Sequence, residues 1–284
     1  AARALDADKI GYTDAFGIPE LRRRIAGHYQ DAYGLDLDPR RVVVTTGSSA
    51  GFLLSFLAAF DAGDRVALAA PGYPAYRNIL SALGVEPVLL MECCAAQEIR
   101  VISDEIYHGI SFGKRAVSAL EISDDAVVIN SFSKYFSMTG WRLGWMILPE
   151  DLLRPVECLA QNLFISAPTL SQIAGCAAFD CKEDLDALVD GYARSRSLLL
   201  DRLPKAGLDK LAPADGAFYV YADVGRFTND SQAFCARMLA EIGVAATPGI
   251  DFDPDRGHRF VRFSFAGAYD EIETAAERIG NWLA

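Results

Sequence analysis

A serine, a lysine and an arginine follow one apolar segment and precede another. The stretch from Asn130 to Trp145 reads NSFSKYFSMTGWRLGW and places Ser131, Lys134 and Arg142 there. Ligand sites in α/β sheets cluster at the carboxyl ends of strands. A lysine among aromatic residues is partly desolvated, which lowers the pKa of its amine and suits it to Schiff-base chemistry. The arginine fork and the serine hydroxyl can bind a phosphate. The alternative is a solvated lysine on a loop.

A second segment, RVISDEIYHG, places Asp104 and Tyr107 at the end of another apolar run. A buried carboxylate beside a pyridine nitrogen keeps that nitrogen protonated and makes the ring an electron sink. The tyrosine can donate to a phenolic oxygen on the same ring. The alternative is that Asp104 and Glu105 begin a turn or helix. We expect His108 to make local hydrogen bonds rather than to catalyse.

The third segment is the turn TTGSSAG, which contains Gly47, Ser48 and Ser49. The backbone N–H groups of the two serines lie at the predicted start of a helix, where phosphates bind. The same letters fit G-x-S-x-G, the nucleophile turn of serine hydrolases, with Ser49 as the nucleophile. An aspartate and His258 could complete such a site, so a hydrolase remains an alternative.

Strands and helices alternate through the first half of the chain. We predict strands at 41–45, 65–69, 85–90, 99–103, 126–130 and 143–148, and helices at 19–33, 50–60 and 73–83. Strands that are apolar on both faces and alternate with helices indicate a mostly parallel sheet covered by helices. The predicted fold class is therefore α/β.

The pattern changes after Pro149 to long helices, predicted at 151–163 and 183–203, and short strands at 217–221 and 260–265. This change predicts a second, smaller α+β unit. We place the boundary near Gly175, giving domains 1–175 and 176–284, although the helix around Arg194 can bridge both.

The composition limits which kinds of partner this chain is expected to bind. The formal charge is −11, which disfavours nucleic acid, and no apolar run is long enough to span a membrane. Six cysteines without a CxxC pair and three histidines predict free thiols and no metal site. A reducing cytoplasm is the expected location.

The segment SFSKYFSMTGWRLGW resembles the cofactor-lysine signature of class I/II pyridoxal-phosphate-dependent aminotransferases of fold type I. GYTDAFGIPELR, the TTGSSAG turn, APGYPAY, SDEIY and VRFSFAG follow the family in the same order, so the resemblance spans nearly the whole chain. It implies a large three-layer domain with a mostly parallel sheet, a smaller α+β C-terminal domain, and pyridoxal 5′-phosphate as cofactor.

The resemblance also implies a role for each matching residue. Lys134 matches the Schiff-base lysine and the general base, Asp104 the partner of the pyridine nitrogen, and Tyr107 the donor to the phenolic oxygen. The phosphate cup matches Ser48, Ser49, Ser131 and Arg142, with Gly47 in the same turn, and Tyr73 matches the ring that stacks on the cofactor.

Two further matches concern the substrate and the assembly. Arg262 matches the arginine that binds the substrate α-carboxylate. Tyr12 matches a tyrosine that reaches the cofactor phosphate of the neighbouring subunit, which implies a homodimer with shared active sites. A salt bridge for Arg262 and a helix-flanking position for Tyr12 are the structural alternatives.

The predicted activity is ping-pong transfer of an amino group from an L-amino acid to a 2-oxo acid through Lys134. A β-lyase or decarboxylase of the same fold and a cofactor-binding regulatory domain are alternatives, and the amino acid is not predicted. One departure stands out near 90–99, where MECCAAQE is too short for a crossover. The family has an N-P-x-G turn there whose Asn contacts the cofactor, so a segment of about 30 residues is predicted to be missing, either deleted or omitted from this sequence. We favour omission, and an intact mass that matches 30.8 kDa would contradict it.

Overall fold

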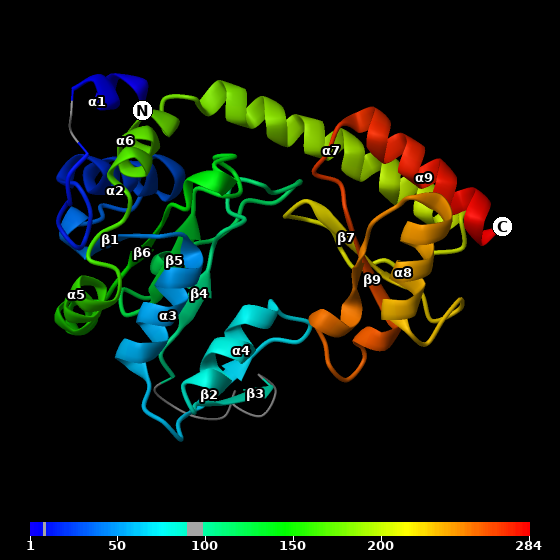
Figure 1. Ribbon diagram of the computed structural model, residues 1–284, viewed down its shortest axis with the longest axis horizontal. Helices are drawn as coiled ribbons and strands as arrows, with labels where there is room; N and C mark the ends of the chain where they lie inside the picture. The colour runs from blue at the N-terminus through cyan, green and yellow to red at the C-terminus, as the bar shows by residue number, and fades with distance from the viewer. Residues whose placement is uncertain (8–9, 90–98) are drawn as a thin grey trace.

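Three sheets and their covering helices make up the computed structural model, which describes residues 1–7, 10–89 and 99–284 (Figure 1). The helices are α1 (Ala2–Asp6), α2 (Pro19–Tyr33), α3 (Ser48–Ala59), α4 (Pro74–Ala82), α5 (Glu150–Leu163), α6 (Thr169–Ala178), α7 (Lys182–Lys205), α8 (Ser231–Ile242) and α9 (Tyr269–Leu283). The strands are β1 (Val42–Thr45), β2 (Arg65–Leu68), β3 (Glu86–Leu89), β4 (Ile102–Asp104), β5 (Val127–Ser131), β6 (Gly144–Ile147), β7 (Tyr219–Asp223), β8 (Thr247–Pro248) and β9 (Phe260–Ser264).

The central sheet has the strand order β1-β6-β5-β4. Strand β4 runs parallel to β5, whereas β6 runs antiparallel to both of its neighbours, with Ile147 opposite Val42 on one side and Val128 on the other. Three of the four strands therefore point the same way. Strands β2 and β3 form a separate parallel pair. The predicted gap near 90–99 falls mainly on residues 90–98, outside the described residues.

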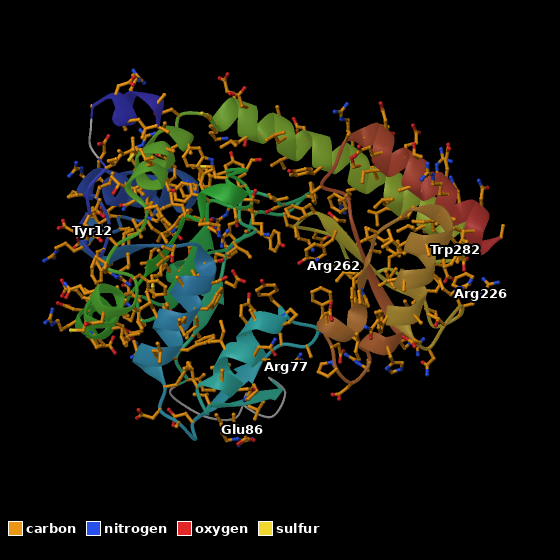
Figure 2. All side chains as sticks on the ribbon, viewed as in Figure 1. Tyr12, Arg77, Glu86, Arg226, Arg262 and Trp282 are labelled. Carbon is orange, nitrogen blue, oxygen red and sulfur yellow. The ribbon has the colours of Figure 1, made fainter. Side chains whose placement is uncertain are left out.

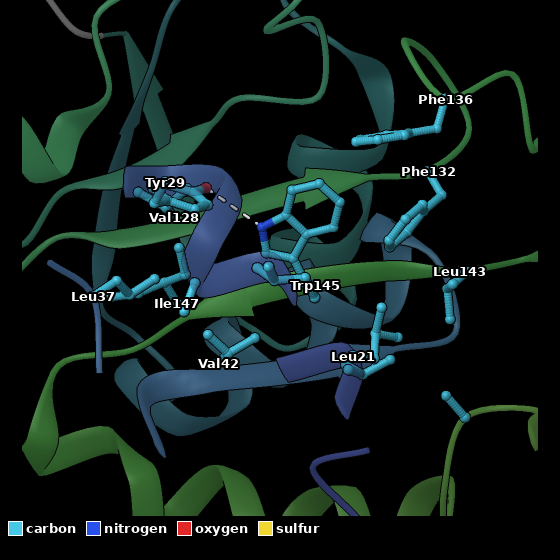
Figure 3. Packing of buried hydrophobic residues seen from close by; sticks show 14 of the residues in the cluster. Leu21, Tyr29, Leu37, Val42, Val128, Phe132, Phe136, Leu143, Trp145 and Ile147 are labelled. Carbon is cyan, nitrogen blue, oxygen red and sulfur yellow. Dashed lines mark hydrogen bonds between the residues drawn. The ribbon is translucent and has the colours of Figure 1, made fainter. Parts of the chain in front are cut away.

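Both faces of the central sheet are buried under helices. Successive side chains of a strand point to opposite faces and so belong to two different cores. Val42 and Trp145 pack with α2 and α6 on one face, while Val43 and Met146 pack with α3 and α5 on the other. Figure 3 shows the first of these cores, where the Trp145 indole N–H donates to Tyr29 Oη at 3.4 Å. The predicted three-layer α/β arrangement is confirmed.

The predicted helix 19–33 agrees with α2 in both bounds, since Pro19 begins it and Gly34 ends it at φ 73°. The strand predicted at 99–103 begins later, at Ile102, because its pairing with β5 begins there. Ile99 and Val101, which belong to the predicted strand, are about half exposed. As a result Asp104 is the last residue of β4 rather than the residue after it.

The C-terminal part is built on the antiparallel sheet β7-β9-β8, which α7, α8 and α9 cover. Helix α7 runs along both parts of the molecule, as Figure 1 shows. It contributes Leu185 to the core beside α2 and Leu199 to the core of the small sheet. The division into 1–175 and 176–284 stays a prediction.

The four cysteines among the described residues, Cys158, Cys176, Cys181 and Cys235, are free thiols, and Cys93 and Cys94 lie outside that part of the chain. Within the same ranges, no helix combines the length and apolar character needed to cross a membrane.

Candidate active site

A cavity of about 710 Å³ lies between the central sheet and the small sheet. It opens at the carboxyl ends of β4 and β5, where α/β sheets bind ligands. Eight of the predicted site residues line it: Ser48, Ser49, Tyr73, Asp104, Tyr107, Lys134, Arg142 and Arg262. The fold thus gathers residues that are far apart in the sequence around one cavity.

Lys134 lies in the loop after β5, with its ammonium nitrogen 5.5 Å from the ring centroids of both Tyr107 and Phe218. Burial lowers the pKa of Lys134, the charge of Arg262 lowers it further, and Asp104 acts in the opposite direction. A lowered pKa increases the uncharged fraction of the amine near neutral pH. The amine can therefore act as a nucleophile or a base.

Asp104 is largely buried, and both of its carboxylate oxygens accept a hydrogen bond. The Ile106 backbone N–H donates to Oδ1 at 3.2 Å, and the Tyr76 hydroxyl donates to Oδ2. Burial raises the pKa of Asp104 to about 6, opposed by the Ile106 N–H and the charge of Lys134. The carboxylate is therefore ionised at neutral pH in a desolvated place, which fits a protonated pyridine nitrogen as partner.

An anion site is formed where α3 begins. Gly47 precedes the helix at φ 81°, and no side chain caps the free N–H groups of Ser48 and Ser49. A methyl carbon at Gly47 would lie 2.7 Å from Nη2 of Arg142, so the guanidinium packs directly on this backbone. Arg142, itself left-handed at φ 49°, donates from Nη1 to the Thr139 carbonyl at 3.0 Å. Its other donors and the helix N–H groups fit a phosphate.

Three predicted cofactor residues, Gly47, Ser131 and Tyr12, do not line the cavity, although Gly47 directly precedes Ser48 and Ser49, which do. Ser131 is buried, and its hydroxyl lies 2.7 Å from that of Ser133, which does line the cavity. Tyr12 is 84% exposed and lies at the outer edge of the molecule, far from Arg262 in Figure 2. Within a single chain, Ser131 is thus one hydrogen bond removed from the cavity and Tyr12 does not reach it.

Arg262 lies on β9 with its guanidinium between two aromatic rings. Its central carbon is 5.0 Å from the Tyr219 ring centroid and 4.5 Å from that of Phe252. Nη2 donates to Thr247 Oγ1 at 3.4 Å, while the buried Nε has no hydrogen-bond partner. An unpartnered buried donor is costly. The arrangement therefore fits a bound carboxylate.

Several residues that line the cavity were missed in the sequence. Tyr76 lies three residues after Tyr73 within APGYPAY, and Phe218 and Tyr219 belong to the aromatic run AFYVY.

Burial raises the pKa of Tyr107, and the neighbouring Tyr219, with which it hydrogen-bonds, raises it further. Tyr107 thus stays protonated and can donate at neutral pH.

The serine-hydrolase alternative lacks a base in this cavity. Ser49 lines it, but no histidine is among its described lining residues. His108 instead bonds Tyr33 through Nδ1 at 2.8 Å, as a local contact. His258, the partner considered for Ser49, lies in the turn before β9 and outside the cavity lining.

Comparisons with known proteins identify the relatives of this chain. The profile described as aminotransferase class I and II matches residues 4–92 and 88–279. A valine–pyruvate aminotransferase of Mycobacterium tuberculosis is 49% identical over 333 aligned positions, covering 100% of this chain and 86% of that protein. A (5-formylfuran-3-yl)methyl phosphate transaminase of Methanocaldococcus jannaschii is 32% identical over 99% of this chain and 85% of its own length. The crystal structure of an aminotransferase from M. tuberculosis superposes with a TM-score of 0.96 at 48% identity, covering 99% of this chain and 86% of that one.

The aligned length bears on the short connection after β3. The 333 aligned positions exceed the 284 residues of this chain, so the mycobacterial relative carries residues that this chain lacks. The two profile matches overlap at 88–92, next to that connection. The missing segment itself stays a prediction.

Proposed function

The chain belongs to the aminotransferase class I and II family, and we propose that the cavity around Lys134 is where it transfers amino groups. The chain is a transaminase that uses pyridoxal 5′-phosphate to move an amino group from an amino acid to a 2-oxo acid. The observation that carries the proposed site is the convergence of Lys134, Asp104, Arg142 and Arg262 on one cavity.

The residues would hold the cofactor at three points. Ser48, Ser49 and Arg142 would bind its phosphate, and Asp104 would accept a hydrogen bond from its ring nitrogen. Tyr107 would donate to its phenolic oxygen. When bound, pyridoxal phosphate supplies an aldehyde that combines with amines and a ring that takes up electrons.

Lys134 would hold the cofactor covalently at rest and then move the proton. Once an amino acid has displaced its amine, the lowered pKa of Lys134 leaves that amine free to accept a proton from the substrate Cα. The rings of Tyr107 and Phe218 limit where the amine can lie. The same amine would then deliver that proton to the cofactor carbon that bore the aldehyde, which completes the proton transfer from the substrate Cα.

The substrate carboxylate would lie on Arg262, whose Nε lacks a partner. Among the described residues that line the cavity, the cations are Lys134, Arg142 and Arg262, and the first two have other roles. No further cation remains there for a side-chain carboxylate, whereas Ile106 and Phe218 are apolar. We infer that an apolar amino acid is the donor, and valine with pyruvate, the pair in the name of the mycobacterial relative, is the first pair to test.

The assembly is proposed to be a homodimer. Tyr12 is 84% exposed and far from the cavity of its own chain, which is compatible with a tyrosine that reaches a neighbouring subunit. A cytoplasmic location and the lack of a nucleic-acid or membrane partner stay predictions from composition.

An amine-transfer assay with cofactor, valine and pyruvate tests the proposed site. We expect alanine and the 2-oxo acid of valine to form in equal amounts, and Lys134→Ala to abolish this. The control Lys205→Ala removes an exposed lysine paired with Asp201 and should leave the rate unchanged. Full activity in Lys134→Ala would overturn the assignment, and activity only with acidic amino acids would overturn the inferred donor.

A further inference from the structure

The Asp104 carboxylate receives a side-chain hydrogen bond from a residue that the transamination chemistry does not require. Tyr76 donates its hydroxyl to Oδ2. We propose that Tyr76 is a positioning residue of the cofactor site, whose hydroxyl keeps the Asp104 carboxylate ionised and aimed into the cavity. The inference rests on the proposed function, since it gives Asp104 a cofactor ring to meet.

The ring of Tyr76 is fixed by its neighbours. It lies in the first turn of α4, which Pro74 begins. Its centroid is 4.7 Å from that of Phe52, a buried residue of α3, and 5.5 Å from that of Tyr73. A ring held on two sides leaves its hydroxyl little freedom, so the bond to Asp104 is preorganised.

The charges around Asp104 explain why such a donor matters. Lys134 lowers the pKa of Asp104 and Glu105 raises it. Asp104 in turn raises the pKa of Tyr107 and of Tyr219. Lys134 is the cation among them, and Glu105 adds a like charge. When Lys134 binds covalently or gives up its proton, Asp104 loses that compensation. The Tyr76 hydroxyl is neutral and does not leave, so it supports the ionised form throughout.

The bond leaves room for the cofactor. An ionised carboxylate has about four lone-pair sites. The Ile106 N–H and the Tyr76 hydroxyl occupy one on each oxygen of Asp104. A ring N–H can use a remaining site, so Tyr76 supports the carboxylate without competing for it.

The first test titrates Asp104 in the protein without cofactor, by the infrared band of its protonated carboxyl. The loss of that band in Asp104→Asn identifies it. We expect Tyr76→Phe, which keeps the ring packing, to raise the midpoint by about one pH unit or more. Tyr269→Phe makes the same change on the partly exposed surface of α9 and should leave the midpoint unchanged. An unchanged or lower midpoint in Tyr76→Phe overturns the proposal.

The second test measures the dissociation constant of pyridoxal phosphate and of an analogue with carbon in place of the ring nitrogen. With the Asp104 pKa moved from about 6 to about 7, its ionised fraction falls about twofold at pH 7 and about fivefold at pH 6. We therefore expect Tyr76→Phe to weaken cofactor binding by about these factors and to leave the analogue unaffected. An equal loss for both compounds means that Tyr76 acts only by packing and overturns the proposal. If the unaltered protein fails to bind the cofactor at all, the proposed function fails, while the titration still decides the role of Tyr76.

Discussion

Replacing Asp104 by asparagine should stabilise the cofactor-free protein. Asp104 has its pKa raised from 3.8 to about 6 by burial, so its ionised form is held at a cost in free energy. That difference corresponds to about 3 kcal/mol when the group is fully ionised. Asparagine has an NH2 group in place of one oxygen, so it cannot accept the hydrogen bonds of both Tyr76 and Ile106 in this geometry. This loss reduces the gain, and we expect a net increase in the free energy of unfolding of about 1–3 kcal/mol.

The pH dependence follows from the direction of the shift. A folded-state pKa above the unfolded value contributes stability that is present below 3.8 and is lost as the pH rises through about 6. The advantage of Asp104→Asn should therefore be largest near pH 8 and become smaller toward about pH 5. A carboxylate that stabilised the fold would give the opposite trend.

Chemical denaturation of the cofactor-free protein at several pH values measures this difference. Asp209→Asn, the same change at an exposed position, is the control. Two results would contradict a destabilising Asp104 carboxylate: an Asp104→Asn variant no more stable than the unaltered protein near pH 8, or an advantage that grows as the pH falls. Cofactor binding should weaken in the same variant, which would show that this stability is given up for function.

Three other variants test separate parts of the site. Gly47→Ala should lower the free energy of unfolding by about 1–3 kcal/mol and weaken cofactor binding, because φ is 81° and the new carbon meets Arg142. The control Gly280→Ala adds its carbon in open space and should have neither effect, so equal effects in the two variants would contradict this cause. Arg262→Lys should raise the KM for the amino acid about tenfold with a smaller change in kcat, since lysine lacks the two-pronged fork; steady-state kinetics decide, and an unchanged KM would count against this role. Tyr12→Ala should leave the stability of the isolated chain unchanged, given 84% exposure, yet weaken cofactor binding by the dimer, and unaltered binding in a titration would refute the shared site.

Local sequence signals predicted much of the fold. Pro19 and Gly34 mark the ends of α2 because proline suits a first turn and glycine accepts the left-handed C-cap. Apolar runs predicted β5 and β6, which are buried on both faces. The predicted start of β4 was wrong, because the strand begins where it pairs with β5. That long-range contact is not encoded in the local apolar sequence. Helix α6 was missed because its apolar face is interrupted by small and polar residues such as Gln172 and Gly175.

The same distinction holds for the site. Lys134 and Arg142 lie in one short motif, so the sequence alone could associate them. Tyr76 and Tyr219 come from α4 and β7, and only folding brings them to Asp104 and Tyr107. A tyrosine with two aromatic neighbours carries no local signal that separates packing from a hydrogen bond to a buried carboxylate.

The central claim is that Lys134 carries the cofactor, and reductive labelling tests it directly. The protein is mixed with pyridoxal phosphate and treated with borohydride, which turns a Schiff base into a stable amine, and the labelled peptide is sequenced by mass spectrometry. We predict one modified lysine, Lys134. Its labelling should be lost in Lys134→Ala, and valine added before the borohydride should prevent it. A label on another lysine, or none at all, would contradict the account.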